Sequence, residues 1–218
     1  MVLPDLQTLP PYDLRLLVSP EGEREIIRFS KSIWNAGPGD LEVRGRRKPD
    51  EQVVQLWQVI VRLYGSATKR PFGALEFHPT HEHWHWEGFS QYEVWSVGAD
   101  GKPDRLLASS GKVGYCMRDD DLLLAYPSGV SVPLPVYRGC GWQRQGISPG
   151  WIDTYDEQTE GQSVDISGLG DGVYALKSTV DPLNRILERD ETNNAALLYF
   201  KLSAHRLTVL ESLSEPEN

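Results

Sequence analysis

Between residues 77 and 86 the chain reads Phe77-His78-Pro79-Thr80-His81-Glu82-His83-Trp84-His85-Trp86, which contains four of its five histidines. Side chains two residues apart point to the same face of a β-strand. The alternation therefore predicts a strand with His81, His83 and His85 on one face. Because neutral imidazole is the commonest protein ligand for transition metals, the same stretch predicts a metal site.

The spacing of these histidines limits how they could share one ion. Alternate residues on a flat strand are roughly 6.5 Å apart, so the outer two of three lie about 13 Å apart. All three reach one ion only if the strand bends or bulges. A site made of imidazoles without thiolate favours copper or zinc, and these residues do not choose between them. The alternative is a polar strand edge or an ordinary hydrogen-bonded histidine cluster.

Elsewhere the chain predicts an all-β, single-domain fold, a β-sandwich with long irregular loops and little helix. Short β-type segments recur between turn signals at residues 25–29, 53–63, 92–95, 113–116, 173–176 and 196–202. The apolar residues of Val53–Tyr64 suit a strand or a helix, and Gly98-Ala99-Asp100-Gly101 is typical of a hairpin tip. We expect a domain over residues 1–210, an irregular loop at Pro127–Pro135, and a frayed acidic tail at residues 211–218.

Charge and hydropathy exclude some partners. The net charge of −9 argues against nucleic acid, whose phosphates need a basic surface, and favours approach of cationic small molecules or basic protein segments. No apolar run approaches the about 20 residues of a membrane helix, and the first residues do not resemble a signal peptide. The protein is therefore expected in the cytosol, or its chain begins after a removed signal. Cys116 and Cys140, the two cysteines, fit one disulfide or two thiols equally well by count.

The order of several motifs resembles the catalytic domain of the lysyl oxidase family, copper- and quinone-dependent amine oxidases. His81-Glu82-His83-Trp84-His85 is similar to the family's copper-binding HxHxH, and Glu87, Phe89 and Tyr92 continue the similarity. The resemblance extends over roughly residues 4–200. Its specificity lies in the order of the motifs, of which the later ones are Ser110–Cys116, Gln145–Tyr155, Gly161–Ile166, Gly172–Tyr174, Val180–Pro182 and Glu188–Asn194.

The resemblance implies a lysine tyrosylquinone, a cofactor made by linking Lys112 to oxidised Tyr155. It implies oxidation of primary amines by dioxygen to aldehydes, with release of hydrogen peroxide and ammonia. Without it, Lys112 reads as an exposed strand-end charge and Tyr155 as a core tyrosine or loop anchor. Asp153 is our candidate general base, with a turn or hydrogen-bond anchor as the alternative. His78 is expected to hold a ligand or a peroxide path from the second coordination shell.

The resemblance also implies a structural calcium ion between the start of the domain and a late loop. Side-chain oxygens crowd this loop, which suits calcium rather than copper. The ligands would be Asp5, the backbone carbonyl of Leu6, Glu188, Asp190, Asn193 and Asn194. The alternative is a polar turn in which the two asparagines cap backbone groups.

The chain also departs from the better-known animal members. It can form at most one of their several disulfides, and Cys116 with Cys140 matches one of them. That match favours an oxidising compartment, extracellular or in the cell envelope, with the cytoplasm not excluded. Gln91 stands where animal members commonly carry a histidine. The role of that histidine, and collagen or elastin as substrate, are therefore not carried over.

Three functions follow from the sequence. The favoured one is an amine oxidase acting on lysine-containing peptides or proteins, or on small amines and diamines, with dioxygen as co-substrate. The second is a copper- or calcium-stabilised β-sandwich that adheres to a surface or carries metal without turnover. The third is a zinc hydrolase, in which three histidines leave an open position for an activated water. Lys112 and Tyr155, in the expected order, distinguish the first from the others.

Overall fold

The computed structural model describes residues 1–47, 53–62, 64–123 and 134–210, and this part of the chain contains strands and no helix. The all-β prediction is confirmed, and the described residues contain no helix that could cross a membrane. The strands are β1 (Leu6–Thr8), β2 (Tyr12–Val18), β3 (Glu25–Asn35), β4 (Leu41–Arg46), β5 (Val54–Val61), β6 (Ala67–His78), β7 (His83–Val97), β8 (Pro103–Tyr115), β9 (Asp121–Leu122), β10 (Arg144–Ile147), β11 (Trp151–Tyr155), β12 (Ser163–Asp165), β13 (Gly172–Val180), β14 (Ala195–Ser203) and β15 (Arg206–Leu210).

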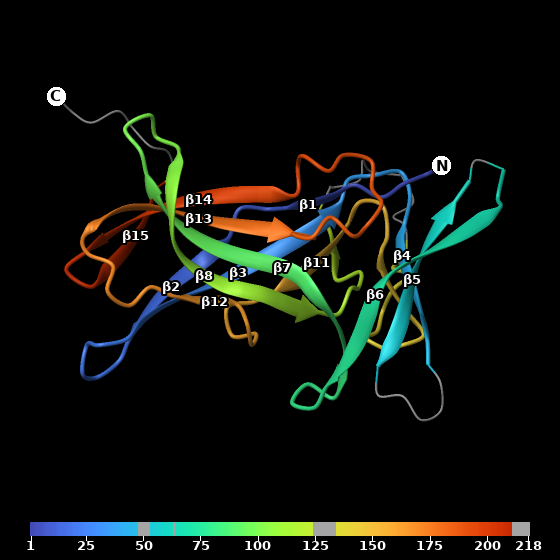
Figure 1. Cartoon of the computed structure of the whole chain (residues 1–218), viewed down its shortest axis with the longest axis horizontal. Coiled ribbons are helices and arrows are strands. Elements are labelled where there is room, and N and C mark those ends of the chain that lie inside the picture. The colour runs from blue at the N-terminus through green and yellow to red at the C-terminus, as the bar shows by residue number, and fades with distance from the viewer. Residues whose placement is uncertain (48–52, 63, 124–133, 211–218) are drawn as a thin grey trace.

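The strands form two antiparallel sheets (Figure 1). One has the order β1-β3-β11-β9, with β2 and β12 also paired to β3. The other has the order β10-β4-β5-β6-β7-β13-β14-β15, with β8 paired to β7. Buried residues of both sheets, such as Phe29 on β3 and Tyr92 on β7, form one hydrophobic core, and these two rings meet edge to face at 4.7 Å.

β3 carries much of this core because its apolar residues alternate. Ile27, Phe29 and Ile33 are fully buried, as expected for one face of a strand. Lys31 occupies the same register and is also fully buried. The sequence predicted a strand only over residues 25–29, whereas β3 continues to Asn35, and so it missed this lysine.

The other predicted strands are present in the structure. The ambiguous Val53–Tyr64 stretch contains strand β5, and every other predicted segment overlaps a strand. Residues 98–101 are the tip between the paired strands β7 and β8, where Gly98 N–H donates to Lys102 O at 2.8 Å and Gly101 has φ +75°. The predicted tail at 211–218, and most of the predicted loop Pro127–Pro135, lie outside the described residues.

A disulfide joins Cys116, just after β8, to Cys140, as the resemblance implied. Trp84 N–H on β7 donates to the Cys140 carbonyl at 3.2 Å. The cross-link therefore holds the loop before β10 against the strand that carries two of the histidines.

Candidate metal and quinone site

The histidines gather where β6 turns back into β7. His78 ends β6, His83 begins β7, and these two are paired in the register. The prediction that all three candidate ligands share one strand is wrong for His81, which lies in the intervening turn. The turn is tight, with Glu82 at φ +55°. Because it folds His81 back over the strand, the long span expected of a flat triplet does not arise.

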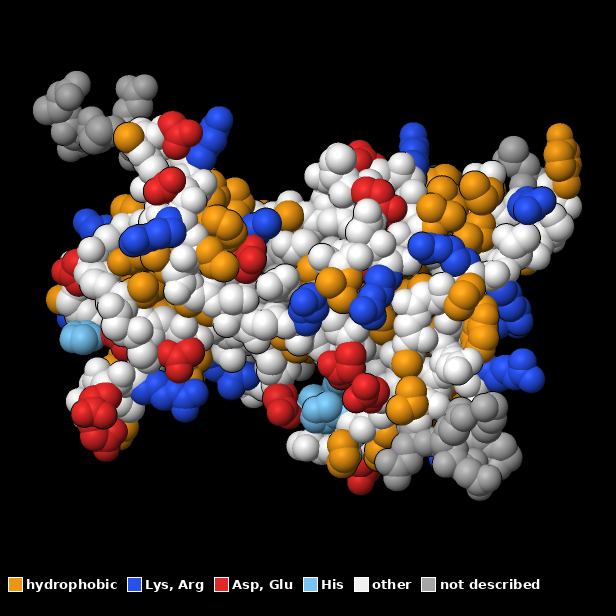
Figure 2. All heavy atoms as spheres, in the orientation of Figure 1, with side chains coloured by type: hydrophobic (Ala, Val, Ile, Leu, Met, Phe, Trp, Pro, Cys, Tyr) orange, Lys and Arg blue, Asp and Glu red, His pale blue; other side chains and the backbone are white. Residues whose placement is uncertain are grey.

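The ring nitrogens of these side chains converge. His85 Nε2 lies 2.8 Å from His83 Nε2 and 3.5 Å from His81 Nδ1. His78 stacks on His81 and His85, with ring centroids 4.3 and 4.8 Å away, and its Nδ1 is buried without a hydrogen-bond partner. Ligand nitrogens of His78, His81 and His85 all lie within 4.8 Å of one another. Four imidazoles thus form one cluster. On the face of the molecule shown in Figure 2, histidine side chains lie beside acidic ones at the lower centre.

Two imidazoles of the cluster have a lowered pKa, which favours their neutral form. Burial, followed by the neighbouring histidines His83, His78 and His81, lowers the pKa of His85 to about 3. Burial also lowers the pKa of His83. On the outer side, His81 Nε2 lies 3.6 Å from the Glu160 carboxylate, so its Nδ1 is the nitrogen that faces the cluster. A metal ion requires neutral imidazole, and carboxylate–imidazole contacts commonly orient such ligands.

Tyr155 lies in the same cavity as three of these histidines. The cavity has a volume of about 410 Å³ and is lined by His81, His83, His85, Tyr115 and Tyr155, among others. Tyr115, which the sequence reading missed, bridges the two groups. Its ring centroid lies 4.1 Å from that of Tyr155 and 6.3 Å from that of His85. The signal available in the sequence was its place next to Cys116 at the end of a predicted strand.

Asp153 and Tyr155 share one face of β11, as an extended segment requires. The Tyr155 hydroxyl donates to Asp153 Oδ2 at 3.0 Å and also to the carbonyl of Cys116. Asp153 is fully buried, and its Oδ1 has no hydrogen-bond partner. Burial, then the charge of Asp120, raises the pKa of Asp153. Burial, then the charge of Asp153, raises the pKa of Tyr155. The phenol of Tyr155 and the buried carboxyl group of Asp153 are therefore joined by a hydrogen bond in which burial disfavours the charged form of both groups.

Lys112 does not line the cavity of Tyr155. It is exposed on β8 and lines a second cavity, of about 260 Å³, with His78, His81 and His85. The cavities of Lys112 and Tyr155 share His81, His85 and Glu160. The structure therefore places the two predicted cofactor residues in two adjoining cavities.

A second lysine, Lys31, lies beside Tyr155. The two are directly paired between β3 and β11, and the Lys31 amine lies 6.0 Å from the centroid of the Tyr155 ring. Burial lowers the pKa of Lys31 to about 7, against the opposing charge of Asp153. The available signal was a lysine in the apolar register of an alternating strand.

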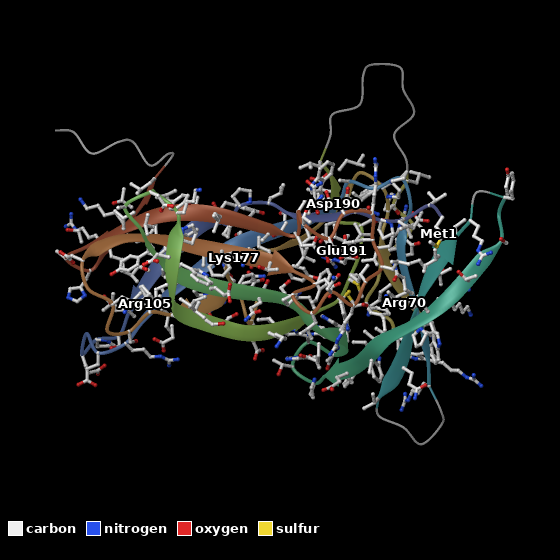
Figure 3. All side chains as sticks on the ribbon, turned by 45° about the horizontal axis from the view of Figure 1, so that its top comes forward. Met1, Arg70, Arg105, Lys177, Asp190 and Glu191 are labelled. Carbon is white, nitrogen blue, oxygen red and sulfur yellow. A yellow bond between two sulfur atoms is a disulfide. The ribbon has the colours of Figure 1, made fainter. Side chains whose placement is uncertain are left out.

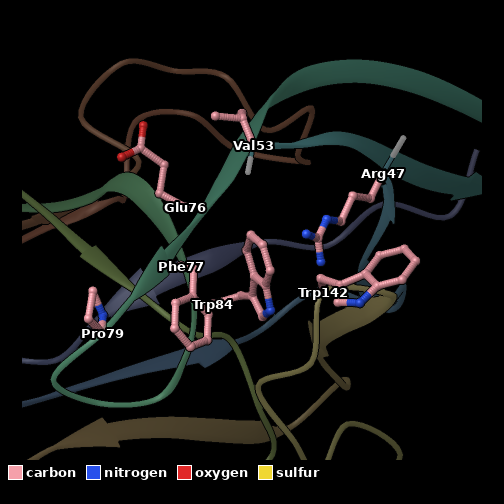
Figure 4. A pocket seen from close by; sticks show the side chains of 7 residues that line it. All are labelled: Arg47, Val53, Glu76, Phe77, Pro79, Trp84 and Trp142. Carbon is pink, nitrogen blue, oxygen red and sulfur yellow. The ribbon is translucent and has the colours of Figure 1, made fainter. Parts of the chain in front are cut away.

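A larger cavity, of about 710 Å³, lies on the opposite side of the β6–β7 hairpin (Figure 4). Trp84, which alternates with His83 and His85, points into it, as the strand period predicts. The Arg47 guanidinium lies 5.6 Å from the Trp84 ring. None of the histidines lines this cavity, so its size does not mark the site of the chemistry.

The predicted calcium ligands come together from both ends of the chain. Glu188 accepts hydrogen bonds from Leu6 N–H at 2.6 Å and from Asn194 Nδ2 at 2.7 Å, while Asn193 Nδ2 donates to Asp5 Oδ1 at 2.8 Å. The Oδ1 atoms of both asparagines are buried without partners. These oxygens fit a hard cation.

Asp190 differs from the other predicted calcium ligands. It is exposed, and its Oδ1 accepts hydrogen bonds from the backbone and hydroxyl of Thr192. It lies beside Glu191 on the loop between β13 and β14 (Figure 3). Of the six predicted ligands, it is therefore the one that faces water.

The chain is similar in sequence to several known proteins. The chain is similar to human protein-lysine 6-oxidase, with 30% identity over 137 residues, which are 62% of this chain and 30% of the relative. It is also similar to mouse lysyl oxidase homolog 4 (26% identity, 86% of this chain, 20% of the relative) and zebrafish lysyl oxidase homolog 3B (28%, 87% and 19%). The chain thus spans less than a third of the length of these relatives. The lysyl oxidase family model matches residues 53–212, and the chain belongs to the lysyl oxidase family.

Proposed function

We propose that this protein is a copper-dependent amine oxidase that converts primary amines to aldehydes with release of hydrogen peroxide and ammonia. The substrates would be peptidyl lysine or small amines and diamines. The observation that carries the proposal is one cavity that holds three imidazoles and Tyr155, whose hydroxyl is hydrogen-bonded to a buried carboxylate. The names of the relatives, protein-lysine 6-oxidase among them, support the same chemistry.

His81, His83 and His85 would hold the copper ion. Nitrogens bound to one ion at about 2.0 Å lie about 3 Å apart, and the distances of 2.8 and 3.5 Å between these rings fit that geometry. The lowered pKa of His83 and His85 also suits a metal ligand, and Glu160 would orient His81. The buried, unpartnered Nδ1 of His78 adds a further nitrogen donor beside the three.

Lys112 and Tyr155 would form the lysine tyrosylquinone, which supplies the electron sink for oxidation of the amine. Lys112 and Tyr155 line adjoining cavities, so their side chains must approach each other before the link can form. Gly111 directly precedes Lys112 and has φ +74°, a conformation that glycine adopts without strain because it has no Cβ.

Acidic side chains would take the substrate proton and attract the cationic amine to the cavity. Asp153, which accepts a hydrogen bond from the Tyr155 hydroxyl before any quinone forms, would accept the α-proton of the substrate as general base. Asp156 and Glu160 line the cavity and are exposed, so a cationic amine is attracted to its mouth. The net charge of −9 acts in the same direction.

A calcium ion would bind between Asp5, the Leu6 carbonyl and the late loop, and tie the N-terminal segment to it. Its ligands in the loop would be Glu188, Asp190, Asn193 and Asn194. The buried orphan oxygens of the two asparagines support this proposal. The Cys116–Cys140 disulfide supports an extracellular or cell-envelope location.

Loading the purified protein with copper in air tests the proposal directly. We expect peptide mass spectrometry to find the peptides of Lys112 and Tyr155 joined, with a net gain of one oxygen and loss of four hydrogens. Hydrogen peroxide release on addition of a primary amine should appear with the link. Copper-loaded protein in which the two peptides stay separate and no peroxide forms would contradict the oxidase function.

Copper affinity of single histidine variants distinguishes the ligands from their neighbour. We expect His83→Ala to weaken copper binding by more than about 100-fold and His78→Ala by about 10-fold, the effect of losing a group that only supports a ligand. Competitive titration against a chelator of known affinity measures both. A larger loss for His78→Ala than for His83→Ala would instead assign the ion to His78, His81 and His85.

One observation favours the second function, a metal-binding sandwich without turnover. Lys112 and Tyr155 line different cavities, and a chain that never joins them would bind metal without oxidising amines. Such a protein would keep copper bound through dialysis and show no peroxide with any primary amine. The mass measurement above separates the two functions.

A further inference from the structure

Lys31 is a fully buried cation that the proposed reaction leaves without a role. It stands on β3 between Ser30 and Ser32, and its amine donates a hydrogen bond to Ser90 Oγ on β7. Four aromatic rings surround the amine, with centroids at 5.3 Å (Phe89), 5.5 Å (Tyr92), 5.3 Å (Tyr115) and 6.0 Å (Tyr155). A lysine in such a position keeps its charge only if an anion lies close by.

The register of β3 and β11 supplies that anion. Lys31 is paired with Tyr155, and Ile33 is paired with Asp153. Directly paired residues share a face, and Asp153 shares the face of Tyr155, so Lys31 and Asp153 are diagonal neighbours across the two strands. Diagonal partners are within reach of a long side chain such as lysine. The Asp153 Oδ1 atom has no hydrogen-bond partner, so the carboxylate lacks a second stabilising group.

The other charges near this pair are already engaged. Arg118 is half-exposed and lies 2.6 Å from Asp120, which also accepts a hydrogen bond from Thr154 N–H. Arg28, on β3, donates to the carbonyls of Glu157 and Thr159. The remaining titratable groups that face Lys31 are the hydroxyls of Tyr92, Tyr115 and Tyr155 from β7, β8 and β11. Among the described residues, Lys31 is therefore the buried cation available to Asp153.

We propose that Lys31 is the buried counter-charge of Asp153 and, as a positioning residue, favours the ionised, proton-accepting form of this carboxylate against the protonated form that burial favours. The inference rests on the proposed function for its consequence, because a protonated Asp153 cannot take the α-proton of an amine substrate. The inference gives Lys31 a role separate from that of Lys112, which is exposed and lines the smaller cavity beside the histidines. Loss of the Lys31 charge would leave a buried carboxylate without a counter-ion, which favours its neutral form.

The test measures the Asp153 carboxyl group in metal-free protein, so it depends on neither copper nor the quinone. Protein labelled with ¹³Cγ-aspartate is titrated by NMR, and the Asp153 signal is assigned by its loss in Asp153→Asn. In Lys31→Met we expect the midpoint of that signal to rise by about 1 to 3 pH units, the effect of removing a nearby opposite charge. Lys31→Arg keeps the charge and should leave the midpoint close to that of wild type.

Lys177→Met is the matched control. Lys177 also lies by an aromatic ring, 5.9 Å from the centroid of Trp95, and its amine is 3.5 Å from Glu93. Its loss should leave the Asp153 midpoint unchanged. An Asp153 midpoint that is the same in wild type and Lys31→Met overturns the proposal.

Two further outcomes are also decisive. If Lys31→Met does not fold, the double variant with Asp153→Asn removes both charges. Recovery of folding by circular dichroism then supports the pair, and failure to recover overturns it. In copper-loaded enzyme, the acidic limb of the plot of kcat/KM against pH should move to higher pH in Lys31→Met. A shifted NMR midpoint in a protein that oxidises no amine would refute the proposed function while leaving the Lys31–Asp153 pair intact.

Discussion

Tyr155→Phe is expected to reduce amine oxidation to background, a loss of about 10⁶-fold or more if the quinone supplies even the low end of typical enzymatic acceleration. Phenylalanine keeps the ring that packs at 4.1 Å against Tyr115 but has no hydroxyl to oxidise. It also removes the hydrogen bond to Asp153. The measurement is hydrogen peroxide release from a primary amine by copper-loaded protein.

Two controls show whether that loss comes from the cofactor. Copper content should be the same in Tyr155→Phe and wild type, because the imidazoles are untouched. Tyr174→Phe removes a hydroxyl that donates to the Gly170 carbonyl, on β13 and away from the histidines, and it should keep full activity. Peroxide release by Tyr155→Phe at more than a tenth of the wild-type rate would show that another group carries the electrons.

Calcium is expected to raise the stability of the protein, and by more at pH 8 than at pH 5. Burial, as the largest cause, raises the pKa of Glu188 from 4.5 to about 8 in the metal-free protein. Between pH 4.5 and about pH 8, Glu188 keeps its proton in the folded state and has lost it in the unfolded state. Stability contributed by this group is therefore present below pH 4.5 and declines as the pH rises toward 8. Each unit of pKa difference corresponds to about 1.4 kcal/mol, so the decline amounts to a few kcal/mol.

A bound calcium ion favours the ionised carboxylate and reverses this decline. The melting temperature in calcium and in chelator, followed by circular dichroism at both pH values, measures the effect. Each kcal/mol shifts the melting temperature of a chain of this size by about 2–4 °C, so we expect a gain of several degrees at pH 8.

Variants of two neighbouring glutamates sharpen the calcium measurement. Glu188→Gln has no charge to bury, so in chelator it should be more stable than wild type at pH 8, and it should lose the response to calcium. Glu191→Gln changes a neighbour whose Oε1 accepts only a long hydrogen bond, 3.4 Å, from Glu188 N–H. It should respond to calcium like wild type. A wild-type melting temperature that calcium leaves unchanged at pH 8 would refute the site.

Local sequence patterns were sufficient to predict much of the fold. Alternating apolar residues predict strands such as β3 and β13, and the Gly98–Gly101 tip predicts the hairpin between β7 and β8, because period and turn chemistry act over a few residues. The apolar alternation did not predict a strand where both of its faces are buried, because buried residues then no longer alternate with exposed ones. Residues 30–33 of β3 are all buried, and this is the part of the strand that the sequence reading missed.

The candidate site divides in the same way. The spacing of its histidines marked the metal-binding stretch, and motif order pointed to Lys112, Tyr155 and Asp153. Neither could show that His81 leaves the strand, since this depends on a turn with Glu82 at positive φ. Nor could they find Tyr115, whose ring contacts those of both Tyr155 and His85 in the folded chain.

By itself, then, the sequence determined the all-β class, the histidine-rich stretch and the family, because these reside in residue types and in spacings along the chain. Only the tertiary structure decided which groups meet. It brought Lys31 beside Tyr155 and Asp153, set Lys112 in a neighbouring cavity, and joined Leu6 to Glu188. These contacts join residues far apart in the chain, and they arise from the pairing of strands and the closing of a common core, which no short stretch of sequence encodes.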